Sequence, residues 1–322
     1  MQPNEQPHGQ YHQAHALVEG LHGLRGFHPG YRTVHALGRI YRGTFTASGD
    51  GAALIRAVHF QPGATVPATA RFSSSAADPE APLSPVAAIA VKFYLDDGTV
   101  TDLVSLSLPL FPLPTPDDYL KFFAVAADPA GKAALLAERP KIAAALQEIM
   151  TTIQAPKSLA ETAYNALHAF WFENAAGQRR AGRYHWVPEA GESGQTVAEL
   201  QALPNDALFN ELEERLAQGP VRFALYLSLA EEGDDLSDPS TAWPPTRERV
   251  LLGQLALTRR TSTAEIGDPI MIHDPTRTTD GIDVTDDPVL NVRRGVYEVS
   301  AVNRGGGWKS RAATAAAAAG AS

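Results

Sequence analysis

The sequence contains no cysteine, which excludes disulfide bonds, thiolate metal sites and a thiol-based peroxidase. It also lacks an apolar run long enough to cross a bilayer, so a membrane partner is not expected. Lysine and arginine never gather into a basic block, and the formal net charge is -9, which argues against a nucleic-acid partner. Any redox chemistry in this chain would therefore need a metal or a bound cofactor.

The chain of 322 residues is long enough for one large β-barrel domain or two smaller domains. We predict an N-terminal arm over residues 1–30, with one short helix near 13–24, followed by a single domain over residues 31–304. Residues 305–322 begin with three glycines and continue rich in alanine without periodicity, which predicts a disordered tail. The first residues show no apolar stretch typical of a signal peptide, so we expect a cytoplasmic protein as the chain is given.

Apolar and polar residues alternate along the first part of the domain. Period-two segments predict strands at residues 39–47, 52–60, 68–74, 87–94 and 99–107. Turn-forming sequences at 48–51 and 96–98 separate some of these segments, which indicates an antiparallel meander. Two further strands are predicted at 221–229 and 249–258. Closure of such a meander into a barrel is the natural way to remove its exposed edges.

Helical signals lie between and after these strands. Residues 116–167 are predicted to be helical because Asp117 and Asp118 provide a cap and alanine-rich, apolar-periodic segments follow. A shorter amphipathic helix is predicted at 210–218, ended by Gly219 and Pro220. Asp287 followed by Pro288 predicts the start of a C-terminal helix. The pattern therefore predicts an α+β protein whose helices cover one face of the barrel.

The predicted C-terminal helix carries polar side chains at spacings of three and four, which places them on one stripe: Leu290, Arg293, Tyr297, Ser300 and Arg304. A phenol is a poor metal ligand until it loses its proton, and a guanidinium one turn away favours the phenolate. The stripe is compatible with a tyrosinate that binds iron, which is the rarer choice among haem ligands. It is also compatible with a surface helix whose arginines are solvated and whose tyrosine is half-buried.

His35 lies in the run Arg32-Thr-Val-His-Ala-Leu-Gly38. An imidazole with an ordinary pKa of about 6.5 can take a proton from a bound peroxide and return it to the leaving oxygen. Ser73 could orient this ring through a hydrogen bond, and Arg32 and Arg71 are suited to pair with carboxylates such as haem propionates. The alternative is a core histidine that a backbone carbonyl satisfies.

Seven segments, in order along the chain, resemble the haem catalases, and more closely the shortened catalase-related peroxidases. They are Arg32–Gly38, Gly43–Phe45, Pro67–Ser73, Ala90–Tyr94, Asp102–Val104, Pro109–Phe111 and Arg293–Arg304. The resemblance runs from about residue 20 to residue 305. It implies a catalase-like antiparallel β-barrel core with flanking helices, a C-terminal helix that carries the proximal ligand, and haem b (iron protoporphyrin IX) as cofactor.

Carried over position by position, the resemblance implies that His35 is the distal acid and base, Ser73 its hydrogen-bond partner and Tyr297 the iron ligand. Arg293 would support the tyrosinate, with Ser300 on the same side of the cofactor. The resemblance also implies candidates for the propionate side and for stacking on the porphyrin, which are Arg32, Arg71 and Arg304, and Phe122, respectively.

The chain departs from full-length catalases after the strand predicted at 99–107. Those proteins carry Asp-Leu-Val-Gly-Asn-Asn-x-Pro, in which the second asparagine orients peroxide beside the distal histidine. Here the sequence is Asp-Leu-Val-Ser-Leu-Ser-Leu-Pro over 102–109, so Ser107 takes that place. A hydroxyl is shorter and has fewer donors than an amide. Because disproportionation needs a second, well-placed hydrogen peroxide, we expect catalase turnover to suffer more than peroxide cleavage.

These features predict a haem-dependent peroxidase that reduces hydrogen peroxide or an organic hydroperoxide with a small organic electron donor, with weak or no catalase activity. Two alternatives are a hydroperoxide dehydratase or isomerase on the same fold, and a non-catalytic barrel that binds haem. The resemblance is compatible with a homo-oligomer. Because some relatives are exported, a periplasmic location is an alternative to the cytoplasm.

Overall fold

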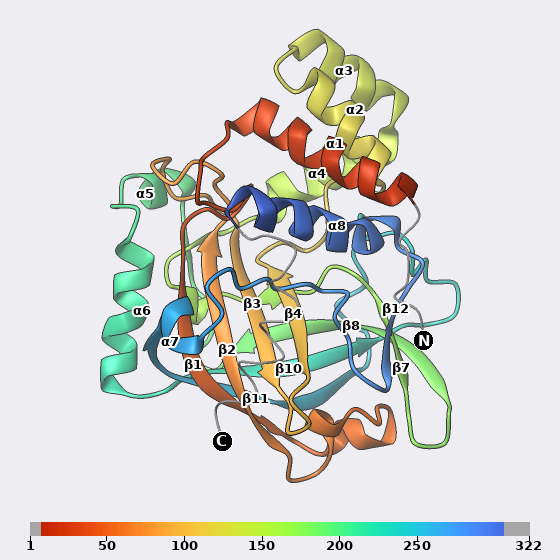
Figure 1. Cartoon of the computed structure of the whole chain (residues 1–322). Coiled ribbons are helices and arrows are strands. Elements are labelled where there is room, and N and C mark those ends of the chain that lie inside the picture. Colours follow the sequence, from red (N-terminus) through yellow and green to blue (C-terminus); the bar gives the residue numbers. More distant parts are fainter. Residues whose placement is uncertain (1–7, 306–322) are drawn as a thin grey trace.

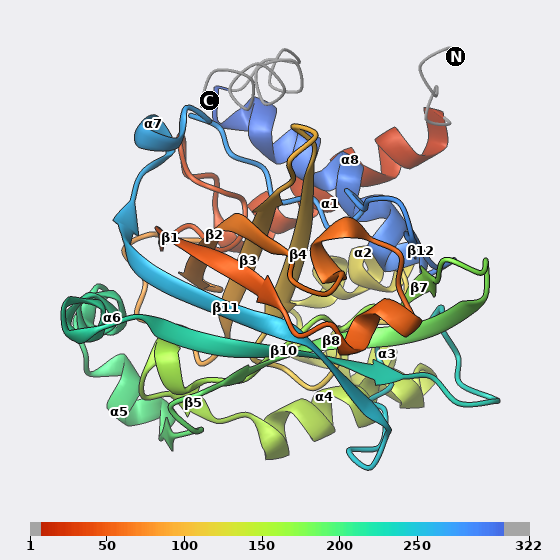
Figure 2. The ribbon, with the colours of Figure 1, turned by 90° about the horizontal axis from the view of Figure 1, so that it is seen from below.

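The structure, a computed structural model, describes residues 8–305. Its centre is a closed barrel of eight antiparallel strands in the order β10-β11-β1-β2-β3-β4-β6-β8, in which β8 returns to pair with β10 (Figures 1 and 2). The barrel strands are β1 (Gly38–Ala47), β2 (Thr65–Ser74), β3 (Ala87–Tyr94), β4 (Val100–Leu106), β6 (Tyr164–Asn165), β8 (Arg179–Pro188), β10 (Val221–Leu229) and β11 (Arg249–Thr261). The predicted antiparallel barrel is therefore confirmed.

Four short strands lie outside the closed ring. β7 (Phe170–Glu173) pairs with β8 and β12 (Ile282–Val284) pairs with β7, while β5 (Ala155–Pro156) and β9 (Gly194–Gln195) form a separate pair. The strands at 87–94 and 221–229 have the predicted bounds, and the turn at 96–98 closes the β3–β4 hairpin with Gly98 at φ 80°. Strands β7, β8 and β12 were not predicted.

The strand predicted at 52–60 is wrong. This segment forms two 3-10 turns, η1 (Asp50–Ala53) and η2 (Val58–Phe60), in which the carbonyl of Gly51 accepts from the N–H groups of Leu54 and Ile55. Local hydrogen bonds replace the sheet ladder here, and both Ile55 and Phe60 are buried in the barrel core. The alternating pattern at 52–60 therefore belongs to a connection that sends side chains into the core, and not to a strand.

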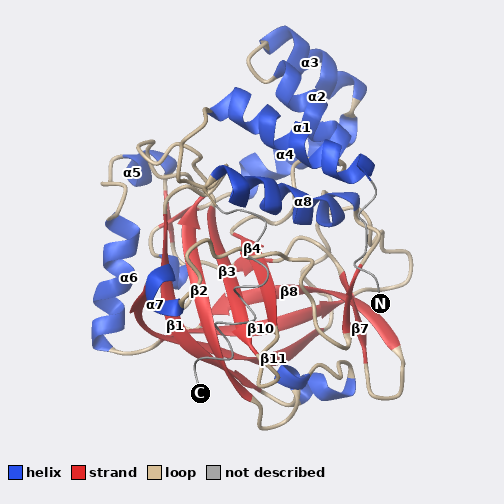
Figure 3. Cartoon of the chain, viewed as in Figure 1, coloured by secondary structure: helices blue, strands red, loops and turns tan. Residues whose placement is uncertain are grey.

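Helices gather at one end of the barrel and along one side (Figure 3). They are α1 (His8–Arg25), α2 (Pro116–Val125), α3 (Pro129–Glu138), α4 (Pro140–Thr152), α5 (Val197–Gln201), α6 (Ala207–Gln218), α7 (Thr263–Ile266) and α8 (Pro288–Asn303), with a further 3-10 turn, η3 (Leu159–Glu161). The helical prediction over 116–167 is correct to residue 152 and wrong beyond it, because Pro156 has no N–H for a helix and the chain enters short strands there.

Residues 8–25 of the predicted N-terminal arm form α1, which packs on α8 and α2 (Figure 1). Ala14 and Leu17 are buried there in a cluster with Val292 of α8. Residues 306–322 of the predicted tail lie outside the described residues. Within residues 8–305, no helix combines the length and the apolar character that crossing a membrane requires.

Aromatic side chains fill the barrel interior. Phe45 makes edge-to-face contacts with Phe60, Phe93 and Trp186 at centroid distances of 5.8, 5.3 and 6.4 Å. All four rings are at most 2% exposed. These rings make the barrel interior a packed hydrophobic core.

Candidate functional site

His35 lies in the connection between α1 and β1, directly before the barrel wall. Among residues 8–305 it is the single non-glycine residue with a positive φ, at 60°. The guanidinium of Arg71 donates to its carbonyl at 2.9 Å, and the N–H of Ala36 donates to the carbonyl of Ala76 at 3.0 Å. Nδ1 of the ring lies 3.2 Å from the hydroxyl of Ser73. The predicted histidine and serine are therefore in contact, and the backbone on both sides of the histidine is held.

The half-buried imidazole of His35 lies in a positively charged environment. Burial, followed by the guanidiniums of Arg71, Arg293 and Arg32, lowers its pKa to about 3. The ring is therefore neutral across the physiological range, which a group that accepts a proton requires.

The predicted propionate-side arginines point their guanidiniums at backbone carbonyls. Arg32 donates to Met271 at 2.6 Å and Arg304 to Ser300 at 3.4 Å, and Arg71 binds the His35 carbonyl. Burial lowers the pKa of all three, well below its usual range for Arg71 and to about 9 for Arg304. Within residues 8–305 none of them forms an ion pair with a carboxylate. The group therefore carries positive charge that a bound anion would compensate.

Gly38, at the start of β1, makes room for one of these arginines. A Cβ built on this residue would lie 2.5 Å from Cζ of Arg71 and 2.6 Å from the carbonyl oxygen of Phe72. The carbonyl of His35 holds the Arg71 guanidinium in place, and the carbonyl of Phe72 belongs to the sheet. Glycine is thus required here for the guanidinium to lie against β1.

The proximal side is built on α8. Oδ1 of Asp287 caps the helix by accepting from the N–H groups of Val289 and Leu290 at 2.8 and 3.1 Å. One Nη of Arg293 donates to the phenol oxygen of Tyr297 at 2.5 Å, as the i, i+4 spacing predicted. The phenol that is the candidate ligand is therefore held by a cation on its own helix.

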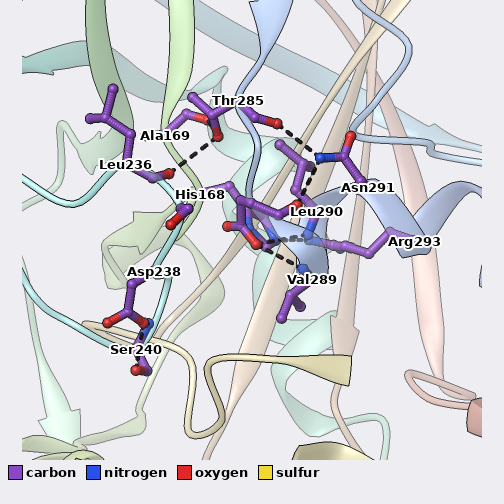
Figure 4. Close-up of polar contacts among 12 residues, drawn as sticks. His168, Ala169, Leu236, Asp238, Ser240, Thr285, Val289, Leu290, Asn291 and Arg293 are labelled. Atoms are coloured by element: carbon purple, nitrogen blue, oxygen red, sulfur yellow. Dashed lines mark hydrogen bonds and ion pairs between the residues drawn. The ribbon is translucent and has the colours of Figure 1, made fainter. Parts of the chain in front are cut away.

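Behind Arg293, His168 was missed by sequence reasoning, and Asp287 was predicted only as the start of the helix. His168 lies just before β7, and its Nε2 is 3.0 Å from the second Nη of Arg293, which it faces in Figure 4. Its Nδ1 is 2.6 Å from Oδ2 of Asp287, and both side chains are almost fully buried. Burial lowers the pKa of His168, so the ring is neutral, with the proton on Nδ1 and the Nε2 lone pair toward Arg293. A chain of contacts thus links Asp287 through His168 and Arg293 to Tyr297.

The remaining predicted residues lie near these groups but have other contacts. The hydroxyl of Ser107 accepts from the backbone N–H of Ala87 at 2.9 Å. Ala87 precedes Ala88, which pairs with Ser73 of β2, so both serines lie at the start of β3. The hydroxyl of Ser300 is buried and contacts Thr33, at 3.2 Å from its hydroxyl. Phe122 lies half-buried on α2, whereas its neighbour Phe123 packs beside Gly20 of α1.

The residues present fit an iron porphyrin with two carboxylate side chains. A phenol held by a guanidinium is suited to ferric iron, a neutral imidazole to peroxide, and a buried arginine group without carboxylate partners to propionates. The wall that faces them carries small side chains, Ala88 and Ala90 of β3, in register with Ser73 and Arg71 of β2. Phenol, imidazole and arginines thus come from α8, the α1–β1 connection and β2.

Comparisons with known proteins give the family that the seven sequence segments resemble. The catalase family model matches residues 29–311. A catalase-related peroxidase of Mycolicibacterium paratuberculosis is 37% identical over 90% of this chain and 94% of that protein, and one of Synechococcus elongatus is 31% identical over 88% and 86%. A fungal catalase structure superposes with a TM-score of 0.77 at 19% identity, covering 93% of this chain and 64% of that one.

The fungal structure supports the fold, and the sequence relatives confirm the resemblance to catalase-related peroxidases. With a family match across most of its length, this chain belongs to the catalase family.

Proposed function

We propose that this protein is a haem b peroxidase that reduces hydrogen peroxide or an organic hydroperoxide with a small organic electron donor, and that it has little catalase turnover. Two relatives of this catalase-family chain that cover most of its length are catalase-related peroxidases, which supports a haem oxidoreductase acting on peroxide. The observation that carries the proposal is the contact of a neutral His35 with Ser73.

The proton transfer is assigned to Nε2 of His35. With a proton on Nδ1 that is donated to the Ser73 hydroxyl, Nε2 carries a lone pair and can take the proton of the bound hydroperoxide. The same nitrogen then returns the proton to the distal oxygen, which leaves as water or an alcohol. Burial and the nearby guanidiniums lower the pKa of the imidazole, which favours the return of the proton to the distal oxygen.

Tyr297 would hold the cofactor through its phenol oxygen, to which Arg293 donates a hydrogen bond. Arg32, Arg71 and Arg304 would bind the propionates. When bound, haem b supplies an iron centre that accepts oxidising equivalents from the peroxide and passes them to the donor. Cofactor retention is thus assigned to α8 together with these arginines, whereas proton transfer is assigned to His35 beside the barrel wall.

Ser107 supports the peroxidase over the catalase assignment. Its oxygen is engaged by the N–H of Ala87, which leaves a single hydroxyl proton to donate. An asparagine amide would offer two donors at greater reach. A second hydrogen peroxide is therefore positioned less well, whereas an organic donor can act from the edge of the cofactor.

The test is peroxide consumption by the purified, haemin-loaded chain, measured with and without a phenolic donor and alongside an oxygen electrode. We expect donor-dependent consumption well above that of free haemin, with little oxygen release. Rapid consumption of an organic hydroperoxide without donor and without oxygen release would instead establish a hydroperoxide dehydratase or isomerase. Oxygen release at half the rate of peroxide loss would establish a catalase, and no haem uptake would overturn the proposal.

A further inference from the structure

His273 is a buried histidine that neither the proton transfer nor the ligand assignment uses. It lies in the connection between α7 and β12 and is 3% exposed. Its Nε2 has no hydrogen-bond partner among residues 8–305. A buried polar atom without a partner costs free energy, so its retention calls for an explanation.

The connection that carries His273 is fixed by charged side chains on both sides. The carbonyl of Met271 accepts from Arg32 at 2.6 Å, and the carbonyl of Ile272 accepts from Nζ of Lys92 at 2.9 Å. The N–H of Asp274 donates to Oδ2 of Asp102 at 2.9 Å. The backbone on each side of the imidazole is thus tied to the barrel wall and to the arginine group.

The charges around this imidazole are unbalanced. Burial lowers its pKa far below the ordinary value, and the cations Lys92, Arg32, Arg71 and Arg277 lower it further, so the ring is neutral. Asp102 forms ion pairs with Lys92 and Arg277, at 2.7 and 2.9 Å. Arg32 and Arg71 have no such partner among the described residues. The positive charge of Arg32 and Arg71 is therefore left for a bound anion to balance.

We propose that His273 is a positioning residue for the cofactor and that its Nε2–H donates to the propionate that Arg32 and Arg71 bind. This inference rests on the proposed haem function. A neutral imidazole adds a directed donor without adding a further positive charge to the two guanidiniums. That combination suits a carboxylate whose charge two arginines already balance.

The experiment compares two variants of similar side-chain length, His273→Gln, which keeps a neutral donor, and His273→Met, which has none. The rate of haem loss to an excess of a tighter-binding acceptor protein is measured at pH 7. Because hydrogen bonds to charged groups are strong, we expect His273→Met to lose haem roughly ten to a hundred times faster than the wild type. His273→Gln should stay within a few-fold of the wild type.

The stability of the haem-free proteins separates cofactor binding from a structural role. Removing an unpartnered buried nitrogen should leave the Tm of haem-free His273→Met equal to or above that of the wild type. A Tm that falls in proportion to the loss of haem retention would mean that the residue is structural, and the inference would fail.

Haemin dimethyl ester, whose propionates carry no charge, identifies the group that accepts from the imidazole. With the ester, the difference between His273→Gln and His273→Met should shrink, because an ester carbonyl accepts a weaker hydrogen bond than a carboxylate does, although all proteins bind the ester less well. A difference as large with the ester as with haemin would overturn the assignment to a propionate carboxylate. If the wild type takes up no haem, the proposed function itself fails, whereas equal haem loss from a haem-binding wild type and His273→Met refutes this inference alone.

Discussion

Replacing Asp287 with asparagine tests the chain of contacts behind the phenol of Tyr297. The two carboxylate oxygens act separately, since Oδ1 caps α8 and Oδ2 accepts from Nδ1 of His168. Asparagine keeps an oxygen for the cap, and it is as good a capping residue as aspartate. Its NH2 group would then face Nδ1 of His168, which carries a proton in the wild type.

The consequence reaches Arg293. To accept from the new amide, His168 must move its proton to Nε2, where it opposes the N–H of Arg293 across 3.0 Å. The loss of a buried hydrogen bond to a carboxylate costs about 2 kcal/mol, and two facing donors add about 1 kcal/mol or more. We therefore expect Asp287→Asn to lower the free energy of unfolding of the haem-free protein by about 3 kcal/mol.

The assay is urea unfolding of the haem-free protein at pH 7, with Asp287→Ala as the second variant. Alanine also removes the cap, which costs about 1 kcal/mol, but it places no amide against His168, so its total cost should be similar to that of asparagine. In the haem-loaded protein, Asp287→Asn should alter the absorption bands that report phenolate ligation. Wild-type stability together with an unchanged spectrum would show that the contacts from Asp287 to Tyr297 have no energetic coupling.

Three further outcomes follow from the site and a fourth from His59, a buried histidine of η2. Tyr297→Phe should fail to retain haem, which a gel-filtered absorption spectrum would show, and full retention would reject the phenol as ligand. His35→Ala should bind haem normally but lose peroxide consumption by a factor of about 10² to 10⁴, the usual range for a positioned acid and base, and unchanged kinetics would remove its assigned role. Ser107→Asn should raise oxygen release relative to donor oxidation, and an unaltered ratio would count against Ser107 as the cause of weak catalase turnover. Burial lowers the pKa of His59 from 6.5 to about 3, so between these pH values the unfolded chain binds a proton that the folded protein does not. The folded protein therefore loses stability as the pH falls below 6.5. His59→Phe should reduce this loss by up to about 1.4 kcal/mol per pH unit, as measured by urea unfolding.

The strands with mostly apolar sequences were the easiest to predict. β3 and β10 are apolar, bounded by turn signals and paired over nearly their whole length, so local pattern and tertiary context agree. Residues 52–60 show the opposite case, because an alternating pattern also arises when a connection sends residues into a barrel end. β8 was missed because its charged start, Arg179-Arg-Ala-Gly-Arg183, hides a strand whose apolar end pairs with β10.

The contacts of the candidate site also differ in whether the sequence could predict them. Arg293 and Tyr297 share a helix, so their contact follows from i, i+4 spacing alone. His35 and Ser73 could be paired only through the family resemblance, since they lie 38 residues apart. His168 contacts Asp287 across 119 residues of sequence and belongs to no local pattern, so only the fold reveals it. His273 had no signal at all, because its distinguishing feature is an absence of partners.

At His35 the left-handed backbone lowers stability, whereas the proposed activity requires the imidazole of the same residue. A side chain with a Cβ costs roughly 1 to 2 kcal/mol in this conformation, and glycine would avoid that cost. A chain selected for thermal resistance alone would therefore drift toward glycine at this position and lose its proton carrier. Selections that screen variants only by melting temperature would thus enrich inactive proteins, and an engineered, more stable form should gain its stability in helices that carry none of the site residues, such as α3 and α4.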